Sequence, residues 1–212
     1  NYKNKKSLLK SILKSVINSE PLKNKYVSDI KPLIQSNVID KSCLKELIYG
    51  VILDTRKKIS ILNKSQLINY SYNVAGTVGI MMAKILNRKN QYAYRYAVDL
   101  GIAMQMTNIM RDFLEDANIN RVYYPQSWIK LTPRKILERN STTVKNINKA
   151  TEKLYKLSEI YYKSAFRGIA FLPFRSRFAI LLALFVYRQI GRKIIKNNFS
   201  NLAKREVVLT YE

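Results

Sequence analysis

AVDLGIAMQMTNIMRDFLEDANINRVYYPQSW, residues 97–128, is the stretch of sequence that decides the fold. Asn108, Asp112 and Asp116 within it are each four residues apart. Because residues four apart lie on one face of a helix, this spacing predicts an amide and two carboxylates along one stripe. The opposite face carries apolar residues at the spacing of a buried side, namely Ile102, Met106, Ile109 and Phe113.

The acidic cluster at the end of this helix has two interpretations. Three of the 14 acidic residues fall between Asp112 and Asp116, although the formal net charge of the chain is +24. Packed carboxylates repel one another unless a cation lies among them, and oxygen ligands suit Mg²⁺, with Mn²⁺ as an alternative. Short acidic clusters are also common on solvated helix faces, here with a pair between Arg111 and Glu115. Spacing alone leaves both interpretations open.

The composition indicates one globular domain and excludes several kinds of site. A chain of 212 residues that is 47% hydrophobic is long enough to bury a core. The absence of His removes the commonest general base and the commonest zinc ligand. The lone Cys43 excludes an intrachain disulfide, and we expect it to be a small buried residue.

The excess of basic residues fits phosphorylated substrates or an anionic membrane surface better than nucleic acid, because no nucleic-acid-binding motif is present. Lys10 and Lys14 interrupt the apolar segment that a signal peptide would need. The longest apolar run, 178–187, has ten residues, against about 20 needed to cross a bilayer. We therefore expect the run to be part of a core helix, the most buried one of the protein.

Apolar periodicity predicts helices along nearly the whole chain. We expect an interruption at Pro32 and helix N-caps at Ser42 and Ser65. The expected helices span 8–16, 27–33, 43–52, 66–86, 91–116, 144–170, 175–195 and 202–211. No segment shows convincing strand alternation, and no repeat is evident. The predicted fold class is all-α, with a single helical domain over residues 1–212.

Gly76 and Gly79 lie inside the expected helix 66–86, where each glycine costs about 1 kcal/mol relative to alanine. Two such residues indicate that something approaches the backbone closely. The approaching group is either a neighbouring helix or an apolar ligand chain, and the sequence leaves both open.

Together the motifs resemble those of the squalene/phytoene synthase family. Residues 108–116, followed by Arg121-Val-Tyr-Tyr-Pro125, resemble its second aspartate-rich motif with the trailing Arg-x-Tyr-x-Pro. YSYNVAGTVG at 70–79 is similar to the family's Tyr-Cys-Tyr-x-Val-Ala-Gly. Tyr161-Tyr162, LPFRS at 172–176 and YRQIG at 187–191 are similar to its C-terminal helices, in wording nearer to the bacterial phytoene synthases than to the squalene synthases.

The chain departs from the family pattern in three places. The first aspartate-rich motif, Asp-Asp-x-x-Asp, has no counterpart, since Asp29, Asp40 and Asp54 are isolated. The chain also stops soon after Arg205. We therefore expect an isoprenoid synthase-type helical bundle that is an internal fragment, incomplete at both ends and catalytically impaired by itself. Asn120 replaces the usual Gly before the signature Arg, and Asn tolerates the left-handed backbone that the turn needs.

The resemblance implies a prenyltransferase of carotenoid biosynthesis that condenses two geranylgeranyl diphosphates head to head, through a cyclopropylcarbinyl diphosphate, to phytoene. Such a reaction needs Mg²⁺ at the leaving diphosphate, cationic side chains around it and a dry aromatic cavity, but no NADPH. A prenyl diphosphate is the expected partner. The expected location is cytoplasmic, or peripheral on the inner face of the membrane, and the oligomeric state is open.

The resemblance also implies roles for single residues. The implied metal ligands are Asn108, Asp112 and Asp116, and the two aspartates also count as catalytic. The implied diphosphate contacts are Arg111, Arg205, Arg121 and Arg188, of which Arg121 and Arg188 are equally well explained as structural. Tyr70 and Tyr187 would face the cation or assist proton movement, unless they are core residues. The implied pocket residues are Val74, Gly76, Val78 and Gln105.

Two other functions stay open at this point. A squalene or hydroxysqualene synthase acting on farnesyl diphosphate would share these motifs, and the missing dinucleotide fingerprint is weak evidence because squalene synthases also lack it. A non-catalytic helical scaffold would explain the missing first motif, but the intact second motif argues against it.

Overall fold

The computed structural model describes residues 2–18, 25–86 and 90–197, and it confirms the all-helical class. Two strands of two residues each are the exception in this part of the chain. The elements are α1 (Tyr2–Asn18), α2 (Lys25–Gln35), α3 (Lys41–Asp54), β1 (Ile59–Ser60), α4 (Lys64–Ser71), η1 (Tyr72–Gly76), α5 (Thr77–Leu86), α6 (Ala93–Arg111), α7 (Phe113–Asn118), β2 (Arg121–Val122), α8 (Pro133–Glu138), α9 (Ser141–Gly168), η2 (Ile169–Phe171) and α10 (Phe174–Lys196). The helix expected at 202–211 and Arg205 lie outside the described residues.

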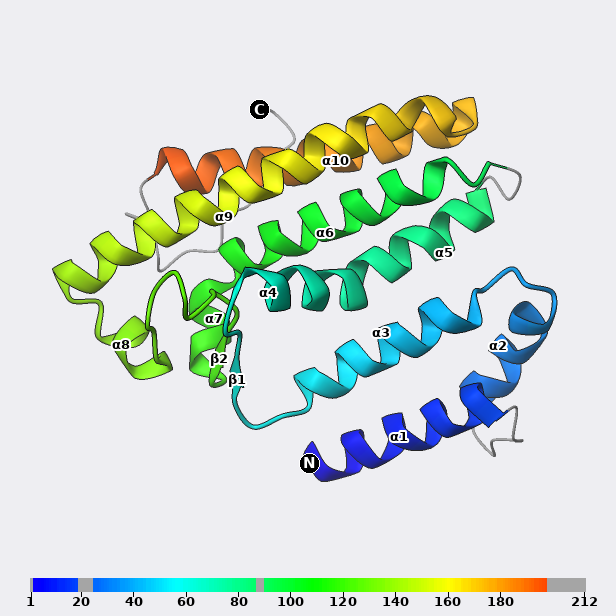
Figure 1. Cartoon of the computed structure of the whole chain (residues 1–212), viewed down its shortest axis with the longest axis horizontal. Coiled ribbons are helices and arrows are strands. Elements are labelled where there is room, and N and C mark those ends of the chain that lie inside the picture. Colours follow the sequence, from blue (N-terminus) through cyan, green and yellow to red (C-terminus); the bar gives the residue numbers. More distant parts are fainter. Residues whose placement is uncertain (1, 19–24, 87–89, 198–212) are drawn as a thin grey trace.

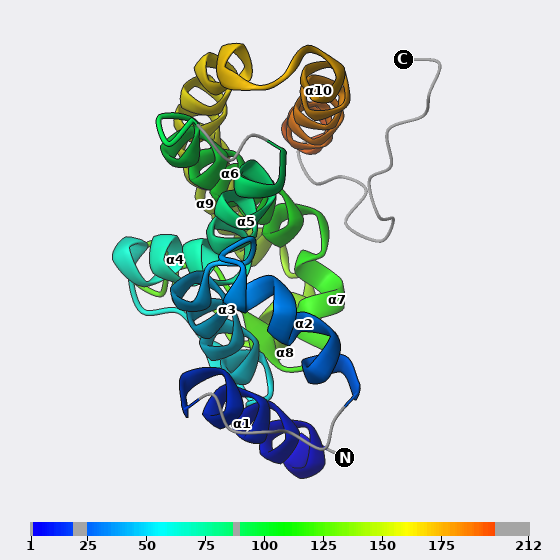
Figure 2. The same cartoon turned by 90° about the vertical axis from the view of Figure 1, so that its right-hand side faces the viewer.

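The helices stack in layers around α6. Figure 1 shows α9 and α10 along one side, α5 and α6 in the middle, and α3 and α1 on the other side; Figure 2 shows the same order from the side. Helix α6 packs against α9, α5 and α10. The main core lies between α4, α6, α7 and α9, where Leu67, Met106 and Leu154 are fully buried. A smaller cluster of Leu13, Val16 and Ile48 holds α1 against α3.

The central helix turns at Asp112, where one continuous helix was predicted. Asp112 has φ −95° and ψ 14°, so α6 ends at Arg111 and α7 begins at Phe113. The backbone hydrogen bonds nevertheless continue four residues apart, from Asp112 N to Asn108 O and from Asp116 N to Asp112 O, both 2.8 Å. The predicted apolar face is confirmed, since Ile102, Met106, Ile109 and Phe113 are all buried.

The predicted helix 66–86 contains a π-helical turn, η1, between α4 and α5. The amide of Thr77 donates to Tyr72 O five residues back, and the Thr77 hydroxyl donates to Asn73 O at 2.8 Å. A π-turn inserts one extra residue into a helix and is common at functional sites. It changes which residues of the 70–79 segment face the neighbouring helices.

Close helix packing explains the glycines of this region. A Cβ on Gly79 would lie 2.1 Å from Ala97 O of α6, and one on Gly101 would lie 2.3 Å from Ala75 O. A Cβ on Gly50 of α3 would lie 2.8 Å from the Val74 side chain. Gly76 is buried and faces the Tyr72 and Val98 side chains. The neighbouring-helix interpretation is thus confirmed for Gly79.

Several local predictions were wrong. The N-cap of α3 is Asp40 and not Ser42, because the Asp40 carboxylate accepts hydrogen bonds from the amides of Ser42 and Cys43. The N-cap of α4 is Asn63 and not Ser65, since its side chain accepts from Gln66 N at 3.0 Å. Helix α2 continues through Pro32 to Gln35, which a proline permits at the loss of one backbone hydrogen bond. Cys43 is buried, as predicted.

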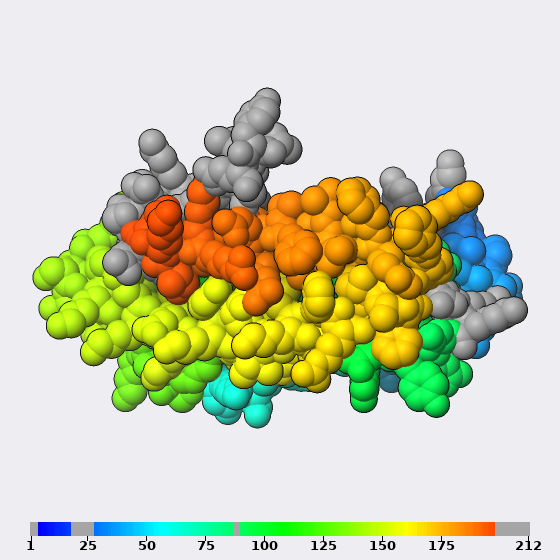
Figure 3. All heavy atoms as spheres, turned by 90° about the horizontal axis from the view of Figure 1, so that it is seen from above, coloured from blue at the N-terminus to red at the C-terminus, as the bar shows by residue number. Residues whose placement is uncertain are grey.

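Helix α10 was predicted to be the most buried helix, and it is instead an outer one. Figure 3 shows α9 and α10 across one face of the molecule. Phe174, Phe178 and Leu182 are 86%, 74% and 53% exposed, because α10 packs only one side against α6 and α9. Its buried residues are Leu184, Ile190, Gly191 and Ile194. In the described part of the chain, no helix has both the length and the apolar character of a membrane span.

The short strands fix the exit of the acidic segment. Strand β1 pairs in parallel with β2, with Ile59 opposite Arg121. The turn before β2 has Asn120 at φ 62°, so the predicted tolerance of Asn at this left-handed position is confirmed. The pairing places the segment after α3 beside the segment after α7.

Candidate active site

A cavity of about 380 Å³ lies between α5, α6, the end of α9 and the start of α10. Its wall is mainly apolar, and Gln105 and Asn108 of α6 are its amide side chains. The predicted pocket residues Val74, Val78 and Gln105 line it, whereas Gly76 does not. The other residues that line the cavity include Ala75, Met82, Leu86, Tyr96, Leu100, Met104, Ala165, Leu172, Ile180 and Ala183.

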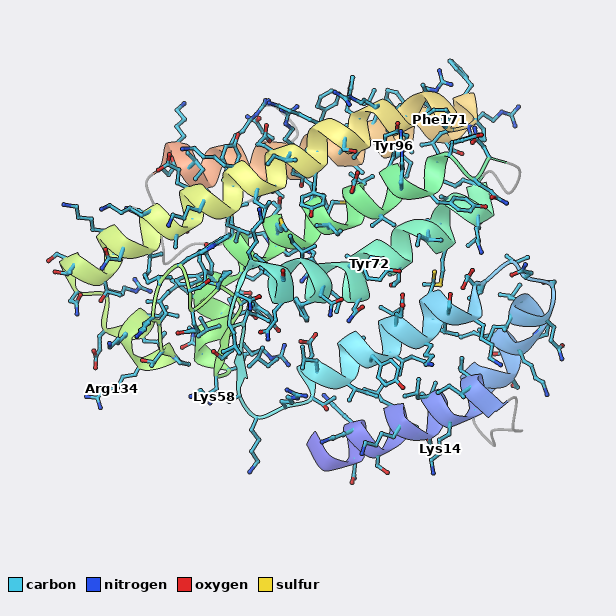
Figure 4. The ribbon with its side chains drawn as sticks, viewed as in Figure 1. Lys14, Lys58, Tyr72, Tyr96, Arg134 and Phe171 are labelled. Atoms are coloured by element: carbon cyan, nitrogen blue, oxygen red, sulfur yellow. The ribbon has the colours of Figure 1, made fainter. Side chains whose placement is uncertain are left out.

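Tyr96, near the start of α6, also lines this cavity and is held by aromatic packing. The Tyr96 ring of α6 stacks on the Phe171 ring of η2, with centroids 5.6 Å apart (Figure 4). Gly168, the last residue of α9, allows this contact, since a Cβ there would lie 2.2 Å from Tyr96 Cβ. The amide end and the aromatic end of the cavity are therefore opposite ends of α6.

Asn108 joins the cavity to the acidic segment. Its Nδ2 donates to Gln105 Oε1 at 3.4 Å, and its Oδ1 is buried without a hydrogen-bond partner in the described part of the chain. A buried amide oxygen without a partner costs stability, so this oxygen is available to a ligand donor or a cation.

Asp112 and Asp116 differ in their electrostatic surroundings. Arg111 donates to Asp112 from Nε to Oδ1 and from Nη2 to Oδ2, both at 2.7 Å, so the predicted pair with Glu115 is replaced by one with Asp112. Burial and the neighbouring Asp112 charge raise the pKa of Asp116 to about 7, and Arg121 opposes this rise. Of these two carboxylates, Asp116 therefore has the negative charge that is less compensated by neighbouring cations.

The residue types at the end of α6 and in α7 are ones that suit Mg²⁺. Among residues 2–18, 25–86 and 90–197, no group of three or more His, Cys, Asp and Glu is gathered closely enough to hold a metal. Asn108, Asp112 and Asp116 still supply amide and carboxylate oxygens, and Mg²⁺ is commonly held by one or two carboxylates plus waters and phosphate oxygens. The unpaired Oδ1 of Asn108 fits a cation at this position.

The remaining predicted cationic and aromatic residues lie in different places. Asp112 and, to a smaller extent, Tyr187 raise the pKa of Arg111 above its ordinary value, which places Tyr187 of α10 beside the acidic segment. Arg188 donates three hydrogen bonds of 2.6–3.1 Å to the carboxylate of Glu159 and so ties α10 to α9. Arg121 Nη2 donates to Asp54 O at 2.7 Å.

Tyr70 does not line the apolar cavity. It is 5% exposed, its hydroxyl donates to the carboxylate of Asp54, and its ring stacks on Tyr123. Sequence reasoning treated Asp54 as isolated and missed both Asp54 and Tyr123. The Arg-x-Tyr signature contains Tyr123 and could have indicated it, whereas no local signal pointed to Asp54, which comes from another part of the chain.

The layered helices, the apolar cavity and the oxygen-rich turn at one end of it are the features of isoprenoid synthases. The fold agrees with this class: a squalene synthase, HpnC, from Alicyclobacillus acidocaldarius has a TM-score of 0.77 at 17% identity, covering 92% of this chain and 73% of the other. A dehydrosqualene synthase has a TM-score of 0.68 at 22% identity, covering 93% and 77%.

The chain belongs to the squalene/phytoene synthase family, whose model matches residues 8–212. It is 37% identical over 148 residues to a 15-cis-phytoene synthase of Enterobacter agglomerans, covering 68% of this chain and 50% of that protein. It is 31% identical over 192 residues to a chloroplastic phytoene synthase of Daucus carota, covering 86% and 48%. The chain thus spans about half the length of the curated relatives that it matches.

Proposed function

We propose that the protein carrying this chain is a phytoene synthase, which condenses two geranylgeranyl diphosphates to phytoene in carotenoid biosynthesis. The observation that carries the proposal is the apolar cavity, which ends at Gln105 and Asn108 one helical turn before Asp112. A long hydrocarbon needs the apolar wall, and a diphosphate needs the polar end. The likeness to the phytoene synthases of Enterobacter agglomerans and Daucus carota supports this assignment.

In this proposal, the turn at Asp112 is the diphosphate end of the site. Asn108, Asp112 and Asp116 would hold Mg²⁺, and bound Mg²⁺ would neutralise the departing diphosphate. Arg111 would contact the diphosphate oxygens once a ligand competes for Asp112. Arg121 and Arg205 are further proposed contacts, while the bonds from Arg188 to Glu159 favour a structural role for that residue.

The apolar cavity would protect the cationic intermediates. In the first half-reaction, one substrate loses diphosphate and the double bond of the second attacks, giving a cyclopropylcarbinyl diphosphate and one proton. In the second half-reaction, this compound loses diphosphate, rearranges and releases a proton. Water would quench these cations, so the apolar wall would exclude it, and Tyr187, which interacts with Arg111, would face the reacting carbons.

A squalene-type synthase acting on farnesyl diphosphate is the second candidate. It would share the motifs of this chain, and the likeness to HpnC at 17% identity concerns the fold alone. A non-catalytic scaffold is less favoured, because a scaffold has no need for an unpaired buried amide oxygen beside two carboxylates.

Contact with an anionic membrane surface is part of the proposal. Phe174 and Phe178, which are 86% and 74% exposed, flank Arg175 and Arg177 at the start of α10, close to the cavity residue Ile180. Aromatic and basic residues together favour the interface of an anionic bilayer. Co-sedimentation with anionic vesicles at low salt, reduced in Phe174→Ser, would support this contact; no co-sedimentation would contradict it.

The substrate is tested by product analysis of the full-length gene product. It is incubated with Mg²⁺ and either geranylgeranyl or farnesyl diphosphate, without NADPH, and the extracted lipids are identified by mass. A C40 hydrocarbon from geranylgeranyl diphosphate supports the proposal. A C30 product from farnesyl diphosphate alone would assign the protein to the squalene side, and no product from either would favour the scaffold.

A further inference from the structure

Asp54 is the last residue of α3 and receives hydrogen bonds from two tyrosines. The Tyr70 hydroxyl lies 3.1 Å from both carboxylate oxygens, and the Tyr123 hydroxyl lies 3.0 Å from Oδ1. The two rings stack with centroids 4.9 Å apart. These tyrosines belong to α4 and to the segment after β2, so one carboxylate connects two segments of the site that are distant in sequence.

The backbone of Asp54 makes a third connection. Arg121 donates from Nη2 to Asp54 O at 2.7 Å, and the charge of Arg121 also acts on Asp116. Arg121, which follows α7, is therefore held by the end of α3. The parallel pairing of β1 with β2 holds the same two segments together.

A half-buried carboxylate is energetically unfavourable if its only role is to make structural contacts. Burying a charge costs free energy that an amide or an apolar residue would avoid, and hydroxyl donors offset only part of that cost. Each phenol has one hydroxyl proton, and Tyr70 and Tyr123 each use it to donate a hydrogen bond to the Asp54 carboxylate. The hydrogen bonds and the stacking on Tyr123 therefore hold the Tyr70 hydroxyl in one orientation.

We propose that Asp54 is a positioning residue, which orients the Tyr70 hydroxyl and, through Arg121, the end of the site that contains Asp116. The inference rests on the proposed prenyl transfer and adds Asp54 and Tyr123 to the residues that support it. Asp54 acts through Tyr70 and Arg121 and does not itself touch the substrate.

The test is Asp54→Asn in the full-length gene product, with Asp40→Asn as the matched control. Asp40 lies at the other end of α3, where it caps the helix and pairs with Lys84. Outer residues that orient a ligand typically contribute about 10- to 100-fold, so we expect kcat with geranylgeranyl diphosphate to fall by that factor in Asp54→Asn. KM should change by about twofold or less, because the residue does not bind the substrate.

Two further variants separate positioning from folding. Tyr70→Phe should lower kcat to a similar degree, and adding it to Asp54→Asn should cause little further loss, because both changes remove the same contact. Asp54→Glu keeps the charge and should recover part of the rate. If Asp54→Asn lowers only the melting temperature, as Asp40→Asn does, and leaves kcat unchanged, the role is structural and the inference is wrong.

A second measurement does not depend on activity. With ¹³Cζ-labelled tyrosine, the NMR signal of Tyr70, assigned through Tyr70→Phe, should shift in Asp54→Asn and stay in place in Asp40→Asn. An unshifted signal would overturn the proposed orientation. Absence of product from the wild-type protein with every diphosphate would instead refute the proposed function, so the two failures are distinguishable.

Discussion

Arg111 donates two parallel hydrogen bonds of 2.7 Å to the carboxylate of its neighbour Asp112. Neighbouring residues on an ideal helix point in different directions, and the turn of the backbone at Asp112 is what permits the pair. The structure thus pairs with each other two side chains that the family resemblance assigns to diphosphate and metal.

Arg111→Lys should destabilise the protein because lysine cannot make two parallel hydrogen bonds. The side chains of Arg111 and Asp112 are only 15% and 22% exposed, so we expect a loss of about 1–2 kcal/mol in the free energy of unfolding. Urea denaturation measures it. The matched control is Arg134→Lys, whose pair with Glu138 is exposed and should contribute nothing measurable. Equal effects in both variants would contradict the structural importance of the Arg111–Asp112 pair.

Gly79→Ala should be strongly destabilising because its Cβ would overlap the carbonyl oxygen of Ala97. The main chain of α6 would have to shift, and overpacking of this kind costs about 1–3 kcal/mol or more. Gly191→Ala is the control, since its Cβ would make an ordinary 3.4 Å contact with the Tyr155 ring. Helix propensity should make that variant neutral or more stable by about 0.5–1 kcal/mol. Thermal unfolding would show the opposite directions, and a tolerated Gly79→Ala would contradict the close packing.

The acid side of the stability profile should depend on Asp40. The hydrogen bond from Lys84 at 2.5 Å holds the pKa of the Asp40 carboxyl well below its ordinary value of 3.8. A lowered carboxyl pKa stabilises the folded state above the unfolded-state pKa, and this contribution is lost as the pH falls through the folded-state pKa. Asp40→Asn should therefore lower the melting temperature at neutral pH. The difference in melting temperature between the variant and wild type should decrease as the pH falls below about 4.

Asp99→Asn serves as the opposite control for that measurement. Burial raises the pKa of Asp99, although a hydrogen bond from Ser164 opposes the rise. A raised carboxyl pKa means that the folded state binds the proton more tightly, so wild type gains stability relative to the Asn variant as the pH falls from neutral. If the stability differences of Asp40→Asn and Asp99→Asn from wild type changed in the same direction with pH, the assigned pKa directions of Asp40 and Asp99 would be wrong.

Filling the cavity from α10 should favour the shorter substrate. Ala183 lines the cavity, whereas its neighbour Leu182 is 53% exposed on the outer side. Ala183→Phe should lower the rate with geranylgeranyl diphosphate by about tenfold or more, with a smaller loss for farnesyl diphosphate. Leu182→Phe should leave both initial rates unchanged. Equal losses for both substrates in Ala183→Phe would contradict a hydrocarbon in this cavity.

Much of the fold follows from apolar periodicity, because helices such as α6 and α9 bury one regular stripe. The burial of α10 was not predictable in this way. Its apolar run indicates a helix, but only the tertiary arrangement shows that Phe174 and Phe178 have no helix packed over them in the described part of the chain. The turn at Asp112 was also not predictable from the sequence. The four-residue helical spacing continues through it, as the backbone hydrogen bonds on both sides show.

The candidate site was predictable where its residues share one segment. The spacing of Asn108, Asp112 and Asp116 placed them together at the end of the predicted helix 91–116, with Gln105 one turn before; in the structure they span the end of α6, the turn and α7. The contacts of Asp54 with Arg121 and Tyr123 join residues 67 and 69 positions apart, and no periodicity in a single sequence encodes such pairs. Spacing offered Glu115 as one partner for Arg111, because the two are four residues apart, whereas the structure pairs Arg111 with Asp112.

The most direct test of the account is product formation by the full-length protein with geranylgeranyl diphosphate and Mg²⁺, compared between wild type, Asp112→Ala and the control Asp40→Asn. We predict a C40 hydrocarbon from wild type and from Asp40→Asn, and a loss of at least about 100-fold in Asp112→Ala. C40 product at an undiminished rate from a folded Asp112→Ala protein would contradict the central claim that the turn at the end of α6 holds the metal and the diphosphate.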